Sequence, residues 1–116
     1  QDKLLVTSYA VEADIIYERD RKIKDLQDGI DSSEATLASL TAVRDRALKR
    51  AEEEKTSSDG VSKNTAKTLA GAERQVKRHT HAVQEKTREL EEMKRFYDDA
   101  LIRYRAMKQR RTGKTK

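Results

Sequence analysis

Cysteine, proline and tryptophan are absent from this chain of 116 residues, and phenylalanine occurs once. Without cysteine the chain forms neither disulfides nor thiolate metal sites, and without proline no residue forces an α-helix to stop or kink. No apolar run approaches the ~20 residues that a membrane-spanning helix requires, and no signal peptide is recognisable. Because the sequence begins at Gln1 and not at Met, we expect a processed or truncated fragment that a signal or another domain could have preceded.

Apolar residues are scarce as well. They make up 34% of the chain, whereas Asp, Glu, Lys and Arg make up 41%, and a typical globular domain has roughly 45–50% apolar residues. Such a chain cannot bury a thick core, but it can bury the narrow stripe that a helical coiled coil requires. Disorder is the alternative, although disordered segments are usually rich in proline and lack periodicity. The composition therefore favours an all-α coiled coil.

In two long segments, mostly apolar residues recur at alternating spacings of three and four. This is the pattern expected for the seam of a coiled coil, the stripe along which one helix packs against the other. In the first segment the stripe is Ile16, Arg19, Ile23, Leu26, Ile30, Ser33, Leu37, Leu40, Arg44, Ala47 and Ala51. In the second it is Leu69, Ala72, Val76, His79, Val83, Lys86, Leu90, Met93, Tyr97, Ala100, Tyr104 and Met107. A sustained seven-residue repeat predicts two helices that supercoil around each other.

The chain divides into five segments. The polar stretch TSSDGVS over residues 56–62 is rich in turn formers, and Gly60 can adopt a positive φ. We therefore predict a short N-terminal helical segment over 1–10, a first coiled-coil arm over 11–55, a turn over 56–62, a second arm over 63–109 and a basic disordered tail over 110–116.

Two arms of matched length joined by a short turn should fold back on each other. Residues 1–60 carry 10 Lys and Arg against 14 Asp and Glu, a net charge of −4, whereas residues 61–116 carry 16 against 7, a net charge of +9. An acidic arm beside a basic arm favours pairing within one chain over a parallel homodimer. The predicted fold is therefore a long antiparallel two-helix coiled-coil hairpin with a short N-terminal helical turn.

The position of the turn determines which residues face each other. With the turn centred near Ser58, Arg19 should face Tyr97 and Ile30 should face Lys86. Polar residues within the stripe should fix the register at a cost in stability, and they are Ser33, Arg44 and Lys86. Near the turn the stripe narrows to small residues that bury little area, so this end should be the weaker one; these are Ala47, Ala51, Ala66 and Ala72.

Three apolar residues, Ile15, Leu101 and Ile102, lie beside the stripe. Two interpretations remain open for them. Either they pack on the N-terminal segment through Leu4, Leu5 and Tyr9, or they form a surface for a second copy. In the second case two hairpins would assemble into a four-helix bundle, which covers the apolar flanks that a lone hairpin leaves partly wet.

The residues typical of catalytic and metal sites do not converge. His79 and His81 are two residues apart and so lie on different helix faces, which favours a seam filler and a surface residue over a metal site. Acidic clusters fit solvated faces, because a two-helix hairpin offers no cleft that shifts a carboxyl pKa. The run Gly113-Lys114-Thr115 lacks the earlier glycine of a phosphate loop. We predict no enzyme, no cofactor and no catalytic, cofactor-binding or metal-binding residues.

The C-terminal end is strongly basic. From Arg103 to Lys116 there are seven basic residues and no acidic ones, which would suit contact with nucleic acid or an anionic membrane surface. Cations are also favoured at a helix C-terminus by the helix dipole. The chain lacks aromatic–basic alternation for base stacking and any recognisable DNA-binding motif. We therefore favour a solubilising helix end over a site for nucleic acid or membrane.

The segment DKLLVTSYAVEADIIYERD, residues 2–20, and its continuation Arg21-Lys22-Ile23 resemble a family of proteobacterial secreted coiled-coil proteins of unknown function. In that family a small N-terminal domain precedes a helical hairpin. Its second helix tends to end on an aromatic–Asp pair and an Arg–aromatic pair, which match Tyr97-Asp98 and Arg103-Tyr104. The resemblance implies a periplasmic or envelope location and no known activity or ligand.

These observations lead to a functional hypothesis. We expect a noncatalytic coiled coil that spaces or docks other components, in the bacterial envelope or otherwise in the cytoplasm, with a protein or a second copy as its partner. The alternative is a basic module that binds nucleic acid nonspecifically through phosphate contacts. A third interpretation is the stalk of an enzyme whose catalytic domain lies elsewhere.

Overall fold

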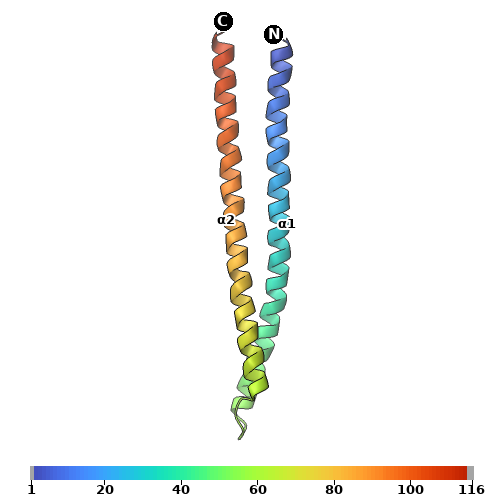
Figure 1. Ribbon diagram of the computed structural model, residues 1–116, viewed down its shortest axis with the longest axis vertical. Coiled ribbons are helices and arrows are strands. Elements are labelled where there is room, and N and C mark those ends of the chain that lie inside the picture. Colours follow the sequence, from blue (N-terminus) through green and yellow to red (C-terminus); the bar gives the residue numbers. More distant parts are fainter. Residues whose placement is uncertain (1, 115–116) are drawn as a thin grey trace. The chain divides into compact units, whose positions relative to one another are not determined.

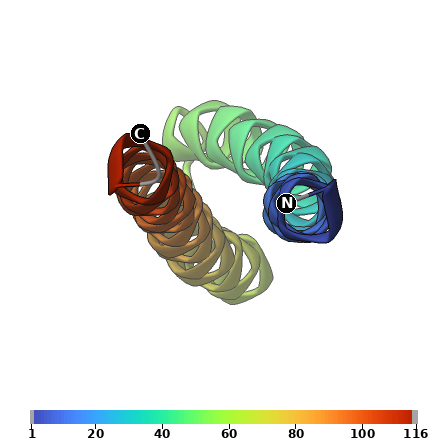
Figure 2. The ribbon, with the colours of Figure 1, turned by 90° about the horizontal axis from the view of Figure 1, so that it is seen from above.

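The computed structural model describes the backbone of residues 2–114 and the side chains of residues 10–111. Over that backbone the chain forms two α-helices, α1 (Asp2–Lys55) and α2 (Lys63–Lys114). They run antiparallel, and their winding is unbroken both from the side (Figure 1) and from above (Figure 2). The predicted all-α helical hairpin is therefore confirmed, and the absence of proline explains why neither helix is interrupted.

The contacts divide the chain into two compact units. The end unit consists of Gln1–Asp28 and Thr87–Lys116, and the turn unit consists of Gly29–Lys86. Each unit thus combines one segment of α1 with one segment of α2, and the turn unit is itself a helical hairpin. A two-helix unit buries only the sides on which its helices meet, which suits the low apolar content of the chain.

The turn follows the helix ends predicted for it. α1 ends at Lys55 and α2 begins at Lys63, so residues 56–62 connect them. Gly60 has a φ of 68°, a conformation that costs glycine little because it has no Cβ. The Ser57 amide donates to the Glu54 carbonyl at 3.0 Å, and the Gly60 amide donates to the Ser57 carbonyl at 3.2 Å. These bonds tighten the end of α1 into the turn.

Both helices extend beyond the predicted arms. α1 is continuous from Asp2, so the segment predicted over 1–10 and the arm predicted over 11–55 belong to one helix. Residues 2–28 contain neither glycine nor proline, and nothing there interrupts the helical hydrogen bonds. α2 continues to Lys114, through most of the tail predicted as disordered over 110–116. Favourable interaction of cationic side chains with the C-terminal end of the helix dipole supports this extension.

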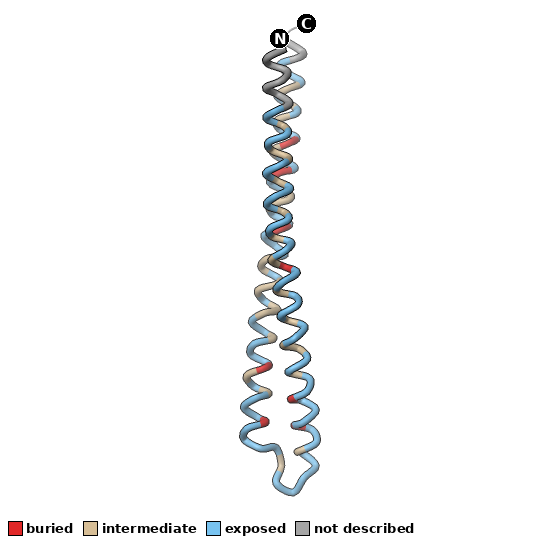
Figure 3. Tube along the Cα trace, turned by 90° about the vertical axis from the view of Figure 1, so that its right-hand side faces the viewer, coloured by how far each residue is buried: buried red, intermediate tan, exposed pale blue. Residues whose placement is uncertain are grey.

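The buried seam follows the predicted stripe closely. Every stripe residue of α1 is buried or half-buried, and so is every stripe residue of α2 except Met107, which is exposed. Figure 3 shows the buried residues as isolated points along the helices and not as a continuous block. The fully buried apolar side chains are Ile30, Ala47, Ala51, Ala72, Leu90, Tyr97 and Leu101. The periodicity of the sequence thus identified the seam.

Some flanking residues differ from expectation. Leu101, predicted beside the seam, is buried, whereas its neighbour Ile102 is 63% exposed. Near the turn Ala66 is exposed, and Thr65 is buried in its place at 4% exposure. The predicted packing of Ile15, Leu101 and Ile102 on Leu4, Leu5 and Tyr9 involves three side chains that lie outside the described residues.

Two contacts between the helices lie three residues from the predicted pairs. The Lys22 ammonium, and not Arg19, lies over the Tyr97 ring, 5.8 Å from its centroid. In the turn unit the Lys86 ammonium donates to the Ser33 hydroxyl at 2.6 Å, where Ile30 was expected. The helix ends at Lys55 and Lys63 are equally far from residue 59. The turn therefore lies later in the chain than a centre at residue 58 implies.

Candidate functional site

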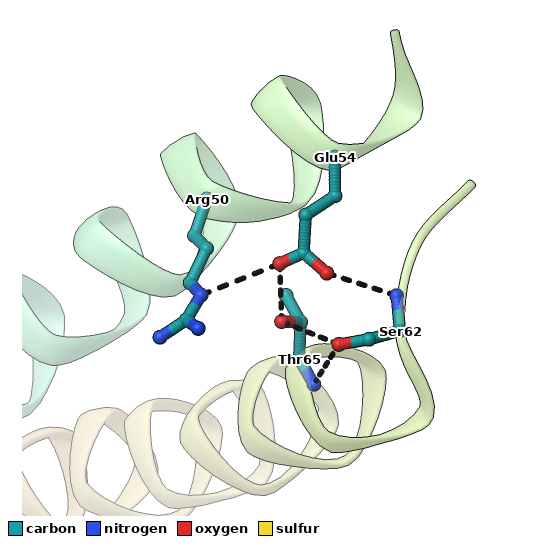
Figure 4. Close-up of polar contacts among 4 residues, drawn as sticks. All are labelled: Arg50, Glu54, Ser62 and Thr65. Carbon is teal, nitrogen blue, oxygen red and sulfur yellow. Dashed lines mark hydrogen bonds and ion pairs between the residues drawn. The ribbon is translucent and has the colours of Figure 1, made fainter. Parts of the chain in front are cut away.

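A polar cluster joins the two helices beside the turn (Figure 4). The Ser62 amide donates to Glu54 Oε1 at 2.9 Å, and the Thr65 hydroxyl donates to Glu54 Oε2. The Thr65 amide donates to Ser62 Oγ at 3.1 Å, which is the bond of a helix N-cap at the start of α2. Arg50, one turn before Glu54, lies 3.3 Å from the same carboxylate. We call these four residues the turn cap.

The turn cap is a capping box divided between two helices. In the usual capping box, the side chain of a Glu or Gln three residues after the N-cap accepts a hydrogen bond from the N-cap amide. Here that position is Thr65, whose side chain is too short to reach back. Glu54 at the end of α1 accepts the hydrogen bond from the Ser62 amide instead. Thr65 completes the link, because its hydroxyl accepts from Ser62 Oγ at 2.9 Å and donates to Glu54. The carboxylate thereby ties the end of one helix to the start of the next.

These bonds stabilise the ionised form of the Glu54 carboxyl. The hydrogen bond from Thr65 is the largest cause, followed by those from Ser62, and the charge of Arg50 adds to them. Together they lower the pKa of Glu54 from 4.5 to about 2. Because the groups that bind the Glu54 carboxylate all belong to the turn cap, we interpret the cluster as stabilising the turn and not as a ligand site.

Acid should therefore unfold the wild-type chain more steeply than a Glu54→Gln variant. The folded pKa of Glu54 is lower than its ordinary value, so its contribution to stability is complete above the ordinary pKa of 4.5 and is lost as the pH falls towards about 2. The measurement is the melting temperature by circular dichroism at several pH values in this window. Glu53→Gln, which removes a neighbouring exposed carboxylate, should keep the full wild-type decline. Parallel pH profiles for wild type and Glu54→Gln would contradict this role.

The structure brings together two of the three polar seam residues. Lys86 and Ser33 form the bond described above, and both side chains are half-buried. Arg44 instead pairs with its neighbour Asp45, at 3.2 Å from Nε and 3.1 Å from Nη2. A cross-helix bond between two polar seam residues satisfies groups that would be costly to bury alone. The bond between Lys86 and Ser33 therefore favours this alignment of α1 against α2 in the turn unit.

The two histidines occupy separate environments. His79 is half-buried in the seam, whereas His81 is exposed and lies 4.0 Å from Glu85. Within the described part of the chain, no three His, Cys, Asp or Glu residues are grouped closely enough to hold a metal ion. The run Gly113-Lys114-Thr115 cannot be assessed, because its side chains lie outside the described residues.

The end unit contains an open groove of about 460 Å³. We call it the aromatic groove, and its lining residues are Lys22 from α1 and Glu89, Glu92, Met93, Phe96 and Tyr97 from α2. The Phe96 and Tyr97 rings meet edge to face, with their centroids 5.2 Å apart and their planes at 90°. Tyr97 is 5% exposed and belongs to the seam, whereas Phe96 is 66% exposed. The groove thus has a buried aromatic floor and an exposed aromatic wall.

Charged groups surround these rings. The Lys22 ammonium lies over the Tyr97 ring and 3.0 Å from the Glu18 carboxylate. Interaction with the Tyr97 side chain, followed by that with Glu18, raises the pKa of Lys22, and the hydrogen bond from Lys22 lowers the pKa of Glu18. Glu89 and Glu92, which also line the groove, are exposed and lie on α2 with Phe96. The groove therefore offers an apolar surface with both a cation and carboxylates at its edges.

Sequence reasoning placed Met93 and Tyr97 in the seam but did not identify the groove. Phe96 is the only phenylalanine in the chain, and it directly precedes a seam position. An aromatic residue at such a place must lie on the flank of a two-helix coiled coil, where no third helix covers it. That signal could have predicted the exposed ring, although not the shape of the groove around it.

The basic end of α2 is partly neutralised within the end unit. Arg105 Nε lies 2.7 Å from Glu12 Oε1, and Lys108 Nζ lies 3.9 Å from Glu12 Oε2. The Glu12 side chain is mostly covered, whereas Arg105 is largely exposed. These ion pairs join the acidic helix to the basic one, as the charge difference between the two halves of the sequence predicts.

These features define the chain as an all-α helical hairpin with a polar cap at its turn and an open aromatic groove in its end unit. Comparison with protein-family models, with curated proteins and with solved structures finds no match. Neither of the described helices has a stretch long and apolar enough to cross a membrane. The function must therefore be inferred from the chemistry of the chain itself.

Proposed function

We propose that this chain is a noncatalytic interaction element that docks another polypeptide against its end unit. The observation that carries the proposal is the exposed ring of Phe96 in the aromatic groove. Phe96 is not needed to close the seam, because Tyr97 and Leu90 already do so. A large apolar side chain left in water next to other apolar surface is typical of a protein contact.

The form of the groove favours a polypeptide over a small molecule. Small-molecule sites usually enclose most of the ligand surface in a concave pocket, whereas this groove is open along a helix flank. An exposed aromatic ring beside a half-buried methionine, with charges at the rim, resembles the centre of a protein interface. The neighbouring carboxylates and the Lys22 ammonium would select the charge pattern of the partner.

We further propose a bacterial envelope location, which the resemblance at residues 2–23 and 97–104 supports. The test is fractionation of cells that express the complete gene product with a C-terminal epitope. Recovery in the periplasmic fraction with a cytosolic marker excluded is the expected result. Recovery with the cytosolic marker would contradict it.

Nucleic-acid binding is a second candidate, because the end of α2 is basic. Two of its cations, Arg105 and Lys108, already contact Glu12, which leaves fewer for phosphate. We therefore expect no measurable binding of a 30-base-pair duplex at roughly 150 mM salt, and no change when Arg110 and Arg111 are both replaced by Gln. Fluorescence anisotropy over a salt series provides the measurement. Binding that weakens steeply with salt and is lost in the double variant would establish this alternative.

Photocrosslinking tests the docking proposal directly. Benzoylphenylalanine is inserted at position 96, where it replaces an aromatic residue, and separately at the exposed position 73 in the turn unit. On irradiation of living cells that produce the chain, position 96 should form a protein adduct of defined mass, and position 73 should not. The absence of any protein adduct at position 96 would overturn the proposed function.

A further inference from the structure

We infer that a second copy of this chain occupies the aromatic groove, with the two α2 helices antiparallel and the two Phe96 rings at the twofold axis. This inference rests on the proposed function, since it names the partner of the docking surface. It differs from an unspecific apolar contact because the charges on either side of Phe96 are arranged in a self-complementary order.

The order is visible in a seven-residue repeat on α2. Glu89, Phe96, Arg103 and Arg110 are spaced seven residues apart, so they recur on one face of the helix. All four are exposed. An acidic residue precedes the aromatic ring along this face, and basic residues follow it. Glu92, which also lines the groove, adds a second carboxylate on the acidic side.

A twofold axis through Phe96 converts this order into complementary contacts. Each residue then faces the one that lies equally far on the other side of position 96 in the second copy. Glu89 therefore faces Arg103 of the second copy, and by symmetry Arg103 faces Glu89 of the second copy. A parallel arrangement would place Glu89 against Glu89 and Arg103 against Arg103, so the charges select the antiparallel one.

The side chains concerned are available for such contacts. Among the described residues, neither Glu89 nor Arg103 forms an ion pair, whereas other charges of the end unit, such as Arg105 and Glu12, do. The contact would remove both Phe96 rings and the adjoining Met93 side chains from water, which supplies the hydrophobic part of the association. Apolar centre and charged ends together match the usual anatomy of an interface.

Sedimentation equilibrium of the full chain over a concentration series tests the inference. Wild type should form a dimer, and Phe96→Ser should raise the dissociation constant about 30-fold or more, because a central aromatic anchor is lost twice. Ile102→Ser is the matched control, since Ile102 is on the same helix and 63% exposed but lies about 120° around the helix from Phe96. It should change the dissociation constant by less than about threefold.

Charge exchange tests the antiparallel arrangement. Glu89→Arg and Arg103→Glu should each weaken the dimer about tenfold, because each places two like-charge pairs across the interface. The double variant restores opposite charges at both places and should return to within about threefold of wild type. Circular dichroism confirms that each variant is folded. A double variant as weak as the single ones would overturn the arrangement.

The crosslinking experiment distinguishes this inference from the proposed function. An adduct at position 96 of twice 13.3 kDa supports a second copy. An adduct of any other protein mass overturns the inference and leaves the proposed function standing. The absence of an adduct overturns both, and a wild-type chain that stays monomeric up to millimolar concentration overturns the inference alone.

Discussion

Leu90→Asp should unfold the end unit or come close to it. Leu90 is 4% exposed and lies in the centre of the α2 stripe, where the substitution removes apolar contacts and places a carboxylate in the seam. Truncation of a buried leucine costs about 2–5 kcal/mol, and an unpaired buried charge adds further cost. We expect the free energy of unfolding to fall by about 4 kcal/mol or more, a large part of the roughly 5–15 kcal/mol typical of a domain.

The control is Arg95→Asp, which introduces the same residue five positions later at an exposed site. It should change the free energy of unfolding by no more than about 0.5 kcal/mol. Thermal and urea unfolding followed by circular dichroism at 222 nm measure both variants. Similar losses in the two variants would show that Leu90 does not pack against α1.

The seam was predictable because helical periodicity depends on local sequence alone. Residues such as Ile30 and Leu90 recur at the spacing that places them on one helix face, and no proline interrupts the pattern. The antiparallel partner was also predictable, because the turn is short and the two halves differ in charge. Those inferences need only the order of residues along each helix.

The register was less accessible, because it depends on where the helices end. The Lys22 ammonium lies over the Tyr97 ring, where Arg19 was expected. An error of one or two residues in the predicted turn centre is enough for such a difference, because it shifts the pairing by twice that amount. Which of two adjacent flanking residues is covered depends on the helix face on which each lies. Leu101 and Ile102 are adjacent apolar residues, yet Leu101 is 3% exposed and Ile102 is 63% exposed.

The turn cap was not predictable from a local motif. Glu54 is the last of three consecutive glutamates, a run that resembles a solvated helix face. Its partners are Ser62, which precedes the next helix, and Thr65 in its first turn, and the position that a capping box reserves for Glu or Gln holds Thr65 instead. Only the folded turn brings the carboxylate to the start of α2. A capping motif shared by two helices has no fixed spacing that a sequence could reveal.

Tyr97→Ala should destabilise the chain far more than Phe96→Ala, although the two residues are adjacent. The Tyr97 ring is 5% exposed and forms the floor of the aromatic groove, so its truncation should cost about 3–5 kcal/mol. Phe96 is 66% exposed, and its truncation should cost less than about 1 kcal/mol. Tyr97→Phe retains the ring and should cost little, although it removes the partner that contributes most to the raised pKa of Lys22.

Unfolding of these variants at low micromolar concentration separates folding from association. Under those conditions Phe96→Ala should have nearly the wild-type melting temperature, while the same variant should lose the dimer at high concentration. Tyr97→Ala should instead have a lower melting temperature than wild type at every protein concentration, because its loss damages the seam within each monomer. Equal destabilisation of both alanine variants in the monomer would mean that Phe96 belongs to the core, and its ring would then not be available to a partner. Comparison of the Tyr97 and Phe96 variants thus tests whether the end unit has a surface for docking.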